Sequence, residues 1–359
     1  MLKQIPIPDE FRHFLGRKLL QFRAWQRARQ VERQIRQSAA PVIKRLRRIK
    51  KSLPPGKAFI GILLTEHLGD IVACEPVIPW LKREHPDSFL IWLAMPAYAG
   101  LLRSHPQLDT VEEIGSLTAC KHVIQAGVFD RFVDLNIHGK SCPVFQRDYF
   151  KSWGNADVDI KNYYFHGALL EAMTHGAGLR TLHEQPRLFL APDTIQTVAG
   201  LKLPAIYVVI HARSTSAIRN WRDDYLNELV GILIQRFGLA VVEIGLHPAI
   251  TCAAPGVINL CGKLSMVASA EVIRRATYFI GIDSGPAHIA NACQIPSVIL
   301  LGHHDVYRTY MPYTGFLRDH ANMMVIQWNG AVADIPVSEV VHRFEMVRLG
   351  VPTIEKVSG

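Results

Sequence analysis

The feature that most constrains the fold is a series of short segments in which hydrophobic residues follow one another without alternation. Examples are residues 59–64, 206–210, 278–282 and 297–301. Strands of this kind are buried on both faces, as in parallel sheets that carry helices on either side. Segments with helical periodicity separate them, so the chain is predicted to form doubly wound α/β structure.

Two such series follow one another, and a length of 359 residues is typical of two domains. The first is predicted to have strands at 59–64, 89–93, 110–114 and 131–135, with helices at 70–84 and 98–103. The second is predicted to have strands at 206–210, 240–244, 278–282 and 297–301, with helices at 224–237, 265–276, 287–293 and 338–348. Residues 191–204, which include two prolines and a glycine, are interpreted as the linker. We therefore expect two Rossmann-like domains facing a cleft, with ligands at the carboxyl ends of the strands.

The predicted boundaries divide the chain into four parts. They are a basic helical extension at 1–57, an N-terminal domain at 58–195, a C-terminal domain at 196–335 and a final helix at 336–359. Pro54, Pro55 and Gly56 mark the end of the extension. The final helix is expected to pack back towards the N-terminal domain.

Positive charge is concentrated in the extension. Residues 1–57 hold 16 of the 40 Lys and Arg residues but only three of the 31 acidic residues. The rest of the chain therefore holds 24 basic and 28 acidic residues and is mildly acidic. This uneven distribution predicts that the extension binds a polyanion.

Apolar side chains recur every three or four residues in the extension, at Phe11, Leu15, Leu19, Phe22 and Trp25. This spacing predicts an amphipathic helix, which Pro41 is expected to interrupt. Aromatic residues on one face, with Lys and Arg around the rest, are typical of a helix lying on an anionic membrane surface. We expect residues 11–51 to bind such a surface and expect no nucleic acid, although a nucleic-acid arm or a helix packed on the body gives a similar pattern.

The sequence also bears on the compartment. No apolar run approaches the roughly 18 residues that span a bilayer, and the N-terminus lacks the pattern of a secretory signal. The six cysteines are scattered without a CxxC spacing, which favours reduced thiols over a disulfide framework or a zinc site. A cytoplasmic protein is expected.

The strongest motif runs from Asp283 through Ser284, Gly285, Pro286 and Ala287 to His288, after the apolar segment that ends at residue 282. Glycine allows a ligand to approach the backbone, and proline is favoured at the start of a helix. Free N–H groups at a helix start attract anions, so a diphosphate fits here. An ordinary strand-to-helix turn with a capping side chain explains the same residues equally well.

Two further loops follow predicted strands. Asp70, after Leu68 and Gly69, is either a helix-capping carboxylate or an ionised base facing the cleft. The loop from Arg213 to Trp221 brings Arg213 and Arg219 close to hydroxyl side chains, which suits a phosphate, although a solvated loop has a similar composition. Its hydroxyl residues are Ser214, Thr215 and Ser216.

Together these motifs resemble the family 9 glycosyltransferases, typified by the lipopolysaccharide heptosyltransferases. The resemblance covers residues 58 to about 350. In the first domain it rests on Gly69-Asp70-Ile71-Val72, Pro76-Val77, Leu81-Lys82-Arg83, His85-Pro86-Asp87, Pro96-Ala97-Tyr98 and His105-Pro106. In the second domain it rests on Cys261-Gly262-Lys263-Leu264-Ser265, the run from Asp283 to His288, and Ile295-Pro296.

The resemblance implies a GT-B fold and an inverting, metal-independent sugar transfer without a cofactor. Asp70 matches the family's proposed general base, and Arg219 matches a position where the family usually has a lysine that neutralises the leaving diphosphate. Asp283 would contact the donor sugar, and backbone amides from Ser284 to His288 would hold the phosphates. The implied donor-binding set is Arg213, Ser214, Thr215, Asp283, Ser284, Gly285, Ala287 and His288, with Gly245 and His247 near the nucleotide.

The implied partners are a nucleotide-diphosphate sugar, such as ADP-heptose or another, and a lipid-linked glycan acceptor. The protein would then act in the cytoplasm, peripheral to the inner membrane. The chain departs from the family pattern at residues 65–68, 245–247 and 302–305. A sugar-nucleotide epimerase of the same fold and a catalytically degenerate nucleotide-sugar-binding protein are the alternatives.

Two short segments contain residue types that typically bind metal ions. Asp157-Val158-Asp159 fits the Asp-x-Asp of metal-dependent transferases, but it lies beside Trp153-Gly154-Asn155 and is interpreted as a loop. His303, His304 and Asp305 are interpreted as a polar loop, because adjacent histidines cannot easily share one ion. No metal site is expected.

Overall fold

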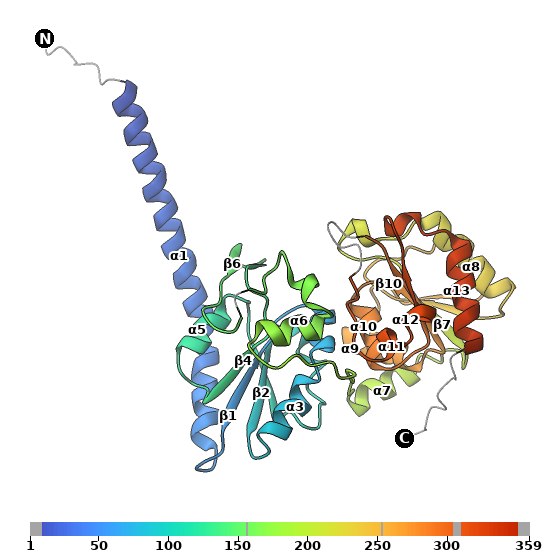
Figure 1. The fold of residues 1–359 in the computed structure, drawn as a ribbon, viewed down its shortest axis with the longest axis horizontal. Coiled ribbons are helices and arrows are strands. Elements are labelled where there is room, and N and C mark those ends of the chain that lie inside the picture. Colours follow the sequence, from blue (N-terminus) through green and yellow to red (C-terminus); the bar gives the residue numbers. More distant parts are fainter. Residues whose placement is uncertain (1–8, 156, 253, 304–309, 351–359) are drawn as a thin grey trace, which may run out of the picture.

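The computed structural model describes residues 9–155, 157–252, 254–303 and 310–350, without side chains at 9–17 and 19. It consists of two α/β domains side by side, with one long helix projecting from the first domain (Figure 1). The two-domain α/β architecture predicted from the sequence is confirmed.

The first domain is built on a four-stranded parallel sheet of order β3-β2-β1-β4. Its strands are β1 (Phe59–Leu63), β2 (Phe89–Ala94), β3 (Thr110–Glu113) and β4 (Arg131–Asp134), close to the predicted positions. The helices are α2 (Leu68–Ala73), α3 (Val77–Glu84), α4 (Pro96–Ala99), α5 (Ala119–Gln125) and α6 (Leu169–Gly176), with a 3-10 turn η1 (Tyr163–His166). A small antiparallel hairpin, β5 (Lys140–Cys142) and β6 (Arg147–Tyr149), was not predicted.

The second domain contains a six-stranded parallel sheet of order β12-β11-β10-β7-β8-β9. The strands are β7 (Tyr207–His211), β8 (Ala240–Glu243), β9 (Val257–Asn259), β10 (Tyr278–Ile282), β11 (Ser297–Leu301) and β12 (Val325–Gln327). Its helices are α7 (Pro192–Ala199), α8 (Asp223–Gln235), α9 (Met266–Arg275), α10 (Gly285–Ala292), α11 (Phe316–Asp319), α12 (Ala321–Met324) and α13 (Val337–Gly350). Two 3-10 turns are η2 (Ala217–Arg219) and η3 (Val332–Asp334).

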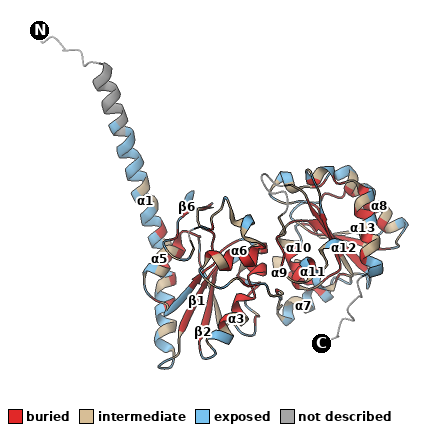
Figure 2. Ribbon diagram, viewed as in Figure 1, coloured by how far each residue is buried: buried red, intermediate tan, exposed pale blue. Residues whose placement is uncertain are grey.

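Burial explains why the apolar segments form these sheets. Every residue of β1, β7 and β11 is buried, and the buried residues of Figure 2 concentrate in the sheets and on the helix faces that cover them. In α8 the buried residues Leu226, Leu229, Val230 and Leu233 follow the 3, 4 and 7 spacing of one helix face. Continuous strands and one-sided helices therefore make up a doubly wound core.

Three sequence-based expectations are corrected by the structure. The predicted helix 70–84 is two helices, because Cys74–Pro76 interrupts it and Pro76 has no N–H to continue the ladder. The predicted linker 191–204 contains α7, which packs on α9 and buries Val198 in the core of the second domain. The chain therefore crosses between the domains in the segment 180–190, which contains neither helix nor strand. The final helix α13 packs on α8 and β11 of the second domain rather than towards the first.

The described part of the extension forms one continuous helix, α1 (Asp9–Ser52), and the expected break at Pro41 is wrong. Pro41 is exposed, so the carbonyl of Gln37 that loses its hydrogen bond also faces solvent. On the opposite face Ala39, Val42 and Leu46 are buried in a core shared with β1, β2 and α5. This packing outweighs the cost of the proline.

The two halves of α1 have different surroundings. The second half is part of the first domain: Arg45 is ion-paired with Glu112, and Lys50 donates to Asp130 at 2.7 Å. The first half projects away from the body (Figure 1), with Phe22 and Trp25 about half exposed. Phe11, Leu15 and Leu19 of the predicted membrane face lie outside the described side chains. Within the described residues no helix combines the length and the apolar character needed to cross a membrane.

Candidate functional site

A cavity of about 500 Å³ lies between the two domains. Both domains contribute to it at the carboxyl ends of their parallel strands, as the fold predicts. From the first domain it is lined by His67, Leu68, Gly69, Asp70, Tyr98, Ile137, Lys140, Ile160, Tyr163 and Leu169. From the second domain it is lined by Ser214, Thr215, Ser216, Arg219, Met266, Asp283, Ser284, Gly285, His288, Tyr310 and Pro312.

Asp70 lies in the first turn of α2, where its Oδ2 accepts hydrogen bonds from the His67 N–H and the Lys140 Nζ, both at 3.1 Å. Burial alone would raise the pKa of Asp70, but the Lys140 ammonium and His67 outweigh it and hold the pKa well below its ordinary value. Asp70 is therefore ionised throughout the physiological range.

Lys140 was missed by the sequence analysis. It is buried at the start of the unpredicted hairpin, and its Nζ also donates to the carbonyl of Glu66 at 3.1 Å. A lone lysine 70 residues from its partner gives no sequence signal. Only the hairpin brings it to Asp70.

Arg219 lies across the cavity in η2. Its Nη1 is 3.4 Å from Oδ2 of Asp283, while the hydroxyl of Tyr313 donates to Oδ1 of Asp283 at 2.8 Å. Burial, reinforced by Asp283, raises the pKa of Tyr313 well above its ordinary value, so the phenol keeps its proton. Arg219 was predicted to contact the diphosphate of a donor and Asp283 its sugar, but here the two side chains form an ion pair with each other.

The N-terminus of α10 points its first turn at the cavity. Ser284 is the N-cap residue, but its side chain does not cap the helix. Its hydroxyl lies 3.1 Å from the Ile282 carbonyl and 3.0 Å from His211 Nδ1, within hydrogen-bonding distance of both. Burial lowers the pKa of His211 to about 4, so this histidine is neutral. His211, at the end of β7, was not predicted.

The backbone amides of the same turn are not all available to a ligand. Pro286 has no N–H, and the N–H groups of Ala287 and His288 donate to the Ser284 carbonyl. The expectation that every amide from Ser284 to His288 is available to a phosphate is therefore wrong for Pro286, Ala287 and His288.

The two domains meet closely beside this turn. A Cβ atom on Gly69 would lie 2.7 Å from the ring of His288, and one on Gly285 would clash with Leu68. His288 is buried, its Nδ1 has no hydrogen-bond partner among the described atoms, and burial lowers its pKa. Glycine at both positions lets α2 and α10 pack against each other.

Some predicted residues lie elsewhere. Arg213 is ion-paired with Asp223, and Ala287 is buried behind the cavity wall. Gly245 and His247 are absent from the described lining of the cavity. Of the polar loop 303–305, His303 lines a smaller recess, and His304 and Asp305 lie outside the described residues.

That smaller recess adjoins the cavity and shares Arg219, Asp283 and Tyr310 with it. Its other walls are mainly apolar and aromatic: Tyr164, Ile218, Leu300, Leu301, Gly302, His303, Gln327, Trp328 and Val332. The aromatic residues come from the short turn η1 and from loops, which have no periodic spacing, and the sequence therefore did not single them out. A ligand that joins a flat, partly apolar group to an anion would fit with the flat group in the recess and the anion in the main cavity.

Comparison with known proteins agrees with this geometry. Residues 178–326 match the family model for glycosyltransferase family 9 (heptosyltransferase). Lipopolysaccharide heptosyltransferase 3 of Escherichia coli is 23% identical over 336 residues, covering 81% of this chain and 95% of that protein.

Two solved structures share the fold. The E. coli ADP-heptose lipopolysaccharide heptosyltransferase II has a TM-score of 0.62 at 17% identity, covering 81% of this chain and 98% of the other. E. coli heptosyltransferase WaaC with ADP has a TM-score of 0.54 at 15% identity, covering 80% and 99%. Taken with the cavity between two parallel-sheet domains, these similarities show the GT-B fold, and the chain is similar to the heptosyltransferases of glycosyltransferase family 9.

Proposed function

We propose that this protein transfers a heptose-type sugar from an ADP-linked donor to a lipid-linked glycan of the lipopolysaccharide type, with inversion at the anomeric carbon. The observation that carries the proposal is the shared cavity, in which Asp70 of one domain faces Arg219 and the α10 N-terminus of the other. The names of the relatives support the donor class, since they specify heptosyl transfer, ADP-heptose and ADP.

Asp70 is the proposed general base. As the acceptor oxygen forms its bond to the anomeric carbon, its proton passes to the Asp70 carboxylate and the bond to the diphosphate breaks. Attack from the side opposite the leaving group inverts the configuration. Lys140 keeps the carboxylate ionised and fixes its orientation through the 3.1 Å contact.

The leaving diphosphate is the proposed ligand of Arg219 and of the N–H groups of Ser284 and Gly285. A guanidinium and a helix N-terminus both stabilise phosphate charge, so the reaction needs no metal ion. In the protein without substrate Asp283 neutralises Arg219. The diphosphate must compete for that guanidinium, and the displacement would free Asp283 to accept a hydrogen bond from a sugar hydroxyl.

The projecting half of α1 is the proposed membrane contact, which would place the protein at the cytoplasmic face of the inner membrane. Phe22 and Trp25 stack with ring centroids 5.8 Å apart, and the Arg29 guanidinium lies 4.3 Å from the Trp25 ring centre. An exposed aromatic pair beside cations suits the interface of an anionic bilayer, where a lipid-linked acceptor is held. The proposed contact is limited to the first half of the helix, because the second half packs on the first domain through the buried residues Ala39, Val42 and Leu46.

The test is a transfer assay with ADP-heptose and heptose-deficient lipopolysaccharide, without added Mg²⁺. Asp70→Asn should lower kcat by about 10²- to 10⁴-fold, the usual contribution of a general base. Asp87→Asn, which changes an exposed acid of the same domain, should have no effect. Full activity of Asp70→Asn would overturn the assignment, and modification of the donor without any acceptor would favour an epimerase.

A further inference from the structure

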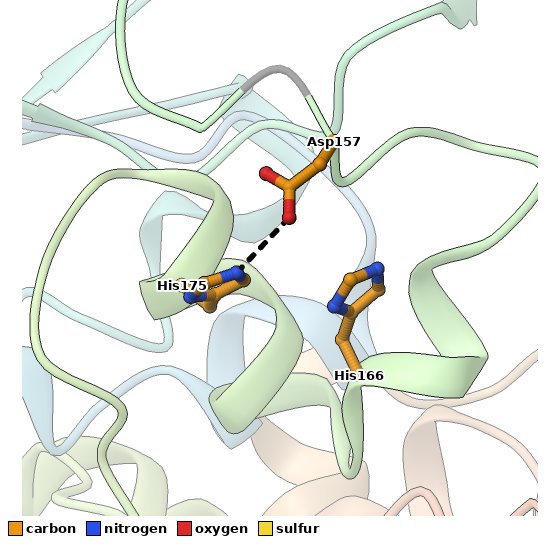
Figure 3. A group of neighbouring side chains, drawn as sticks. All are labelled: Asp157, His166 and His175. Atoms are coloured by element: carbon orange, nitrogen blue, oxygen red, sulfur yellow. Dashed lines mark hydrogen bonds and ion pairs between the residues drawn. The ribbon is translucent and has the colours of Figure 1, made fainter.

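Three side chains with metal-binding atoms converge outside the cleft. Asp157 comes from the loop before η1, His166 ends η1, and His175 lies in the last turn of α6 (Figure 3). One ligand atom from each lies within 4.8 Å of the other two. The sequence analysis interpreted the Asp157 segment as a loop and gave the two histidines no role.

The backbone holds these segments together closely. Gly154 has a φ of +74°, and a Cβ atom there would clash with the Gly176 carbonyl at the end of α6. The Asn155 N–H donates to that same carbonyl at 3.2 Å, and its side-chain amide donates to the His175 carbonyl at 2.8 Å. Gly154 and Asn155 are therefore fixed against the helix end, and Asp157 lies beside His175.

The distances fit a metal ion. First-row metals bind nitrogen and oxygen at about 2.0–2.2 Å, so two ligands of a tetrahedral ion lie roughly 3.3–3.5 Å apart. His175 Nε2 is 3.4 Å from Asp157 Oδ2. The ligand atom of His166 lies within 4.8 Å of both partners, so its side chain would have to move towards them to bind the same ion.

We propose that Asp157, His166 and His175 bind a divalent transition-metal ion such as Zn²⁺, with water completing the coordination. Two imidazoles and one carboxylate suit zinc, iron, cobalt or nickel, whereas Mg²⁺ and Ca²⁺ require oxygen ligands. A hydrogen-bonded ion pair accounts for Asp157 and His175 alone. It does not account for His166, whose ring stacks on His175 at 5.5 Å with an interplanar angle of 24°.

The ion would have a structural role, separate from the transfer reaction. His166 closes the short turn that begins at Tyr163, and Tyr163 lines the main cavity. The rings of Tyr163 and Tyr164 both contact Tyr310, with centroids 6.3 and 5.5 Å apart. Fixing His166 to α6 would therefore stabilise the turn that forms one wall of the cleft.

Metal binding also requires a change in protonation. The Asn155 amide that donates to the His175 carbonyl lies 3.4 Å from His175 Nδ1, which places the ring proton on Nε2, facing Asp157. The ion would bind at Nε2 and the ring proton would move to Nδ1, so the long contact between Nδ1 and the Asn155 amide would open.

The experiment titrates the full chain, free of a histidine tag and treated with chelator, with Zn²⁺ and with Co²⁺. One equivalent should bind with a raised melting temperature, and bound Co²⁺ should give a visible absorption band. His166→Gln and His175→Gln should weaken binding on the order of 10- to 100-fold, the effect of perturbing a metal's ligand environment. His342→Gln, an exposed histidine on α13, is the matched control and should bind as the unaltered protein does.

The metal-free melting temperature of each variant separates loss of binding from loss of folding. Unchanged affinity in His166→Gln and His175→Gln would overturn the proposal. Failure of the unaltered chain to bind Zn²⁺ below millimolar concentration would also overturn it and leave only an ion pair. None of these outcomes depends on catalytic activity, so the proposed transfer reaction is tested separately.

Discussion

At the scale of single residues, the cleft contains two ion pairs, one in each domain. Asp70 is paired with Lys140, and Arg219 is paired with Asp283. The buried histidines His211 and His288 are neutral because burial lowers their pKa values. Because Asp283 is paired with Arg219, the guanidinium becomes fully available to a diphosphate only when Asp283 is displaced.

Lys140→Met tests the link between Lys140 and the proposed base. Loss of the ammonium should raise the pKa of Asp70, because the opposing effect of burial remains. With Lys140 present, the Asp70 carboxylate loses its charge only in strong acid. In the variant it should be protonated at a higher pH, so the acidic limb of the pH profile of kcat/KM should move to higher pH. Lys263→Met, in the second domain, should leave the limb in place. Identical profiles for all three proteins would rule out electrostatic control of Asp70 by Lys140.

At the scale of elements, α1 joins two halves with different surroundings in one continuous helix. Leu46 and its buried neighbours join it to the core of the first domain, while the half containing Trp25 remains free of that core. The sequence predicted a helix and its basic character correctly. It could not predict continuity through Pro41, because the compensating contacts come from α5 and the sheet, far along the chain.

The projecting half can be tested with vesicles containing anionic phospholipid. The double variant Phe22→Ala and Trp25→Ala should bind at least about tenfold more weakly, because burying one such side chain contributes about 1.5–3 kcal/mol. Binding should also weaken with salt, since the surrounding cations act electrostatically. Ile206→Ala, which removes an exposed apolar group from the second domain, serves as the control. Equal binding by the double variant would locate the membrane contact elsewhere.

At the scale of the whole molecule, the site depends on how the two domains approach each other. Asp70 and Ser284 face one cavity because α2 and the start of α10 pack together, with Gly69 against His288 and Gly285 against Leu68. A displacement of about 1 Å in a reacting geometry can cost on the order of 10²-fold in rate. The spacing of the domains is therefore part of the proposed mechanism.

Gly69→Ala should lower the kcat/KM of heptosyl transfer by roughly tenfold or more, because the new Cβ would lie 2.7 Å from the His288 ring and force the two surfaces apart. Gly115→Ala adds a Cβ in open space in the same domain and should have wild-type kinetics. Melting temperatures of both variants distinguish a shifted interface from unfolding. Wild-type kinetics in Gly69→Ala would show that the close contact is dispensable.

The sequence by itself determined most strands of the two sheets and the residue types that follow them. Continuous apolar runs specify buried parallel strands, and Asp70, Arg219 and Asp283 follow them at positions where any such sheet directs its loops into the cleft. These are local properties, readable from neighbouring residues.

Only the tertiary structure decided which distant groups meet. Lys140 reaches Asp70 through a hairpin, Arg219 is neutralised by Asp283, and His166 joins Asp157 and His175 at the end of α6. The helix α7 was also decided by tertiary contacts: its composition resembles a linker, and packing on α9 stabilises it as a helix. Contacts between residues far apart in the chain leave no periodic signal, because their partners are selected by packing and burial rather than by neighbouring sequence.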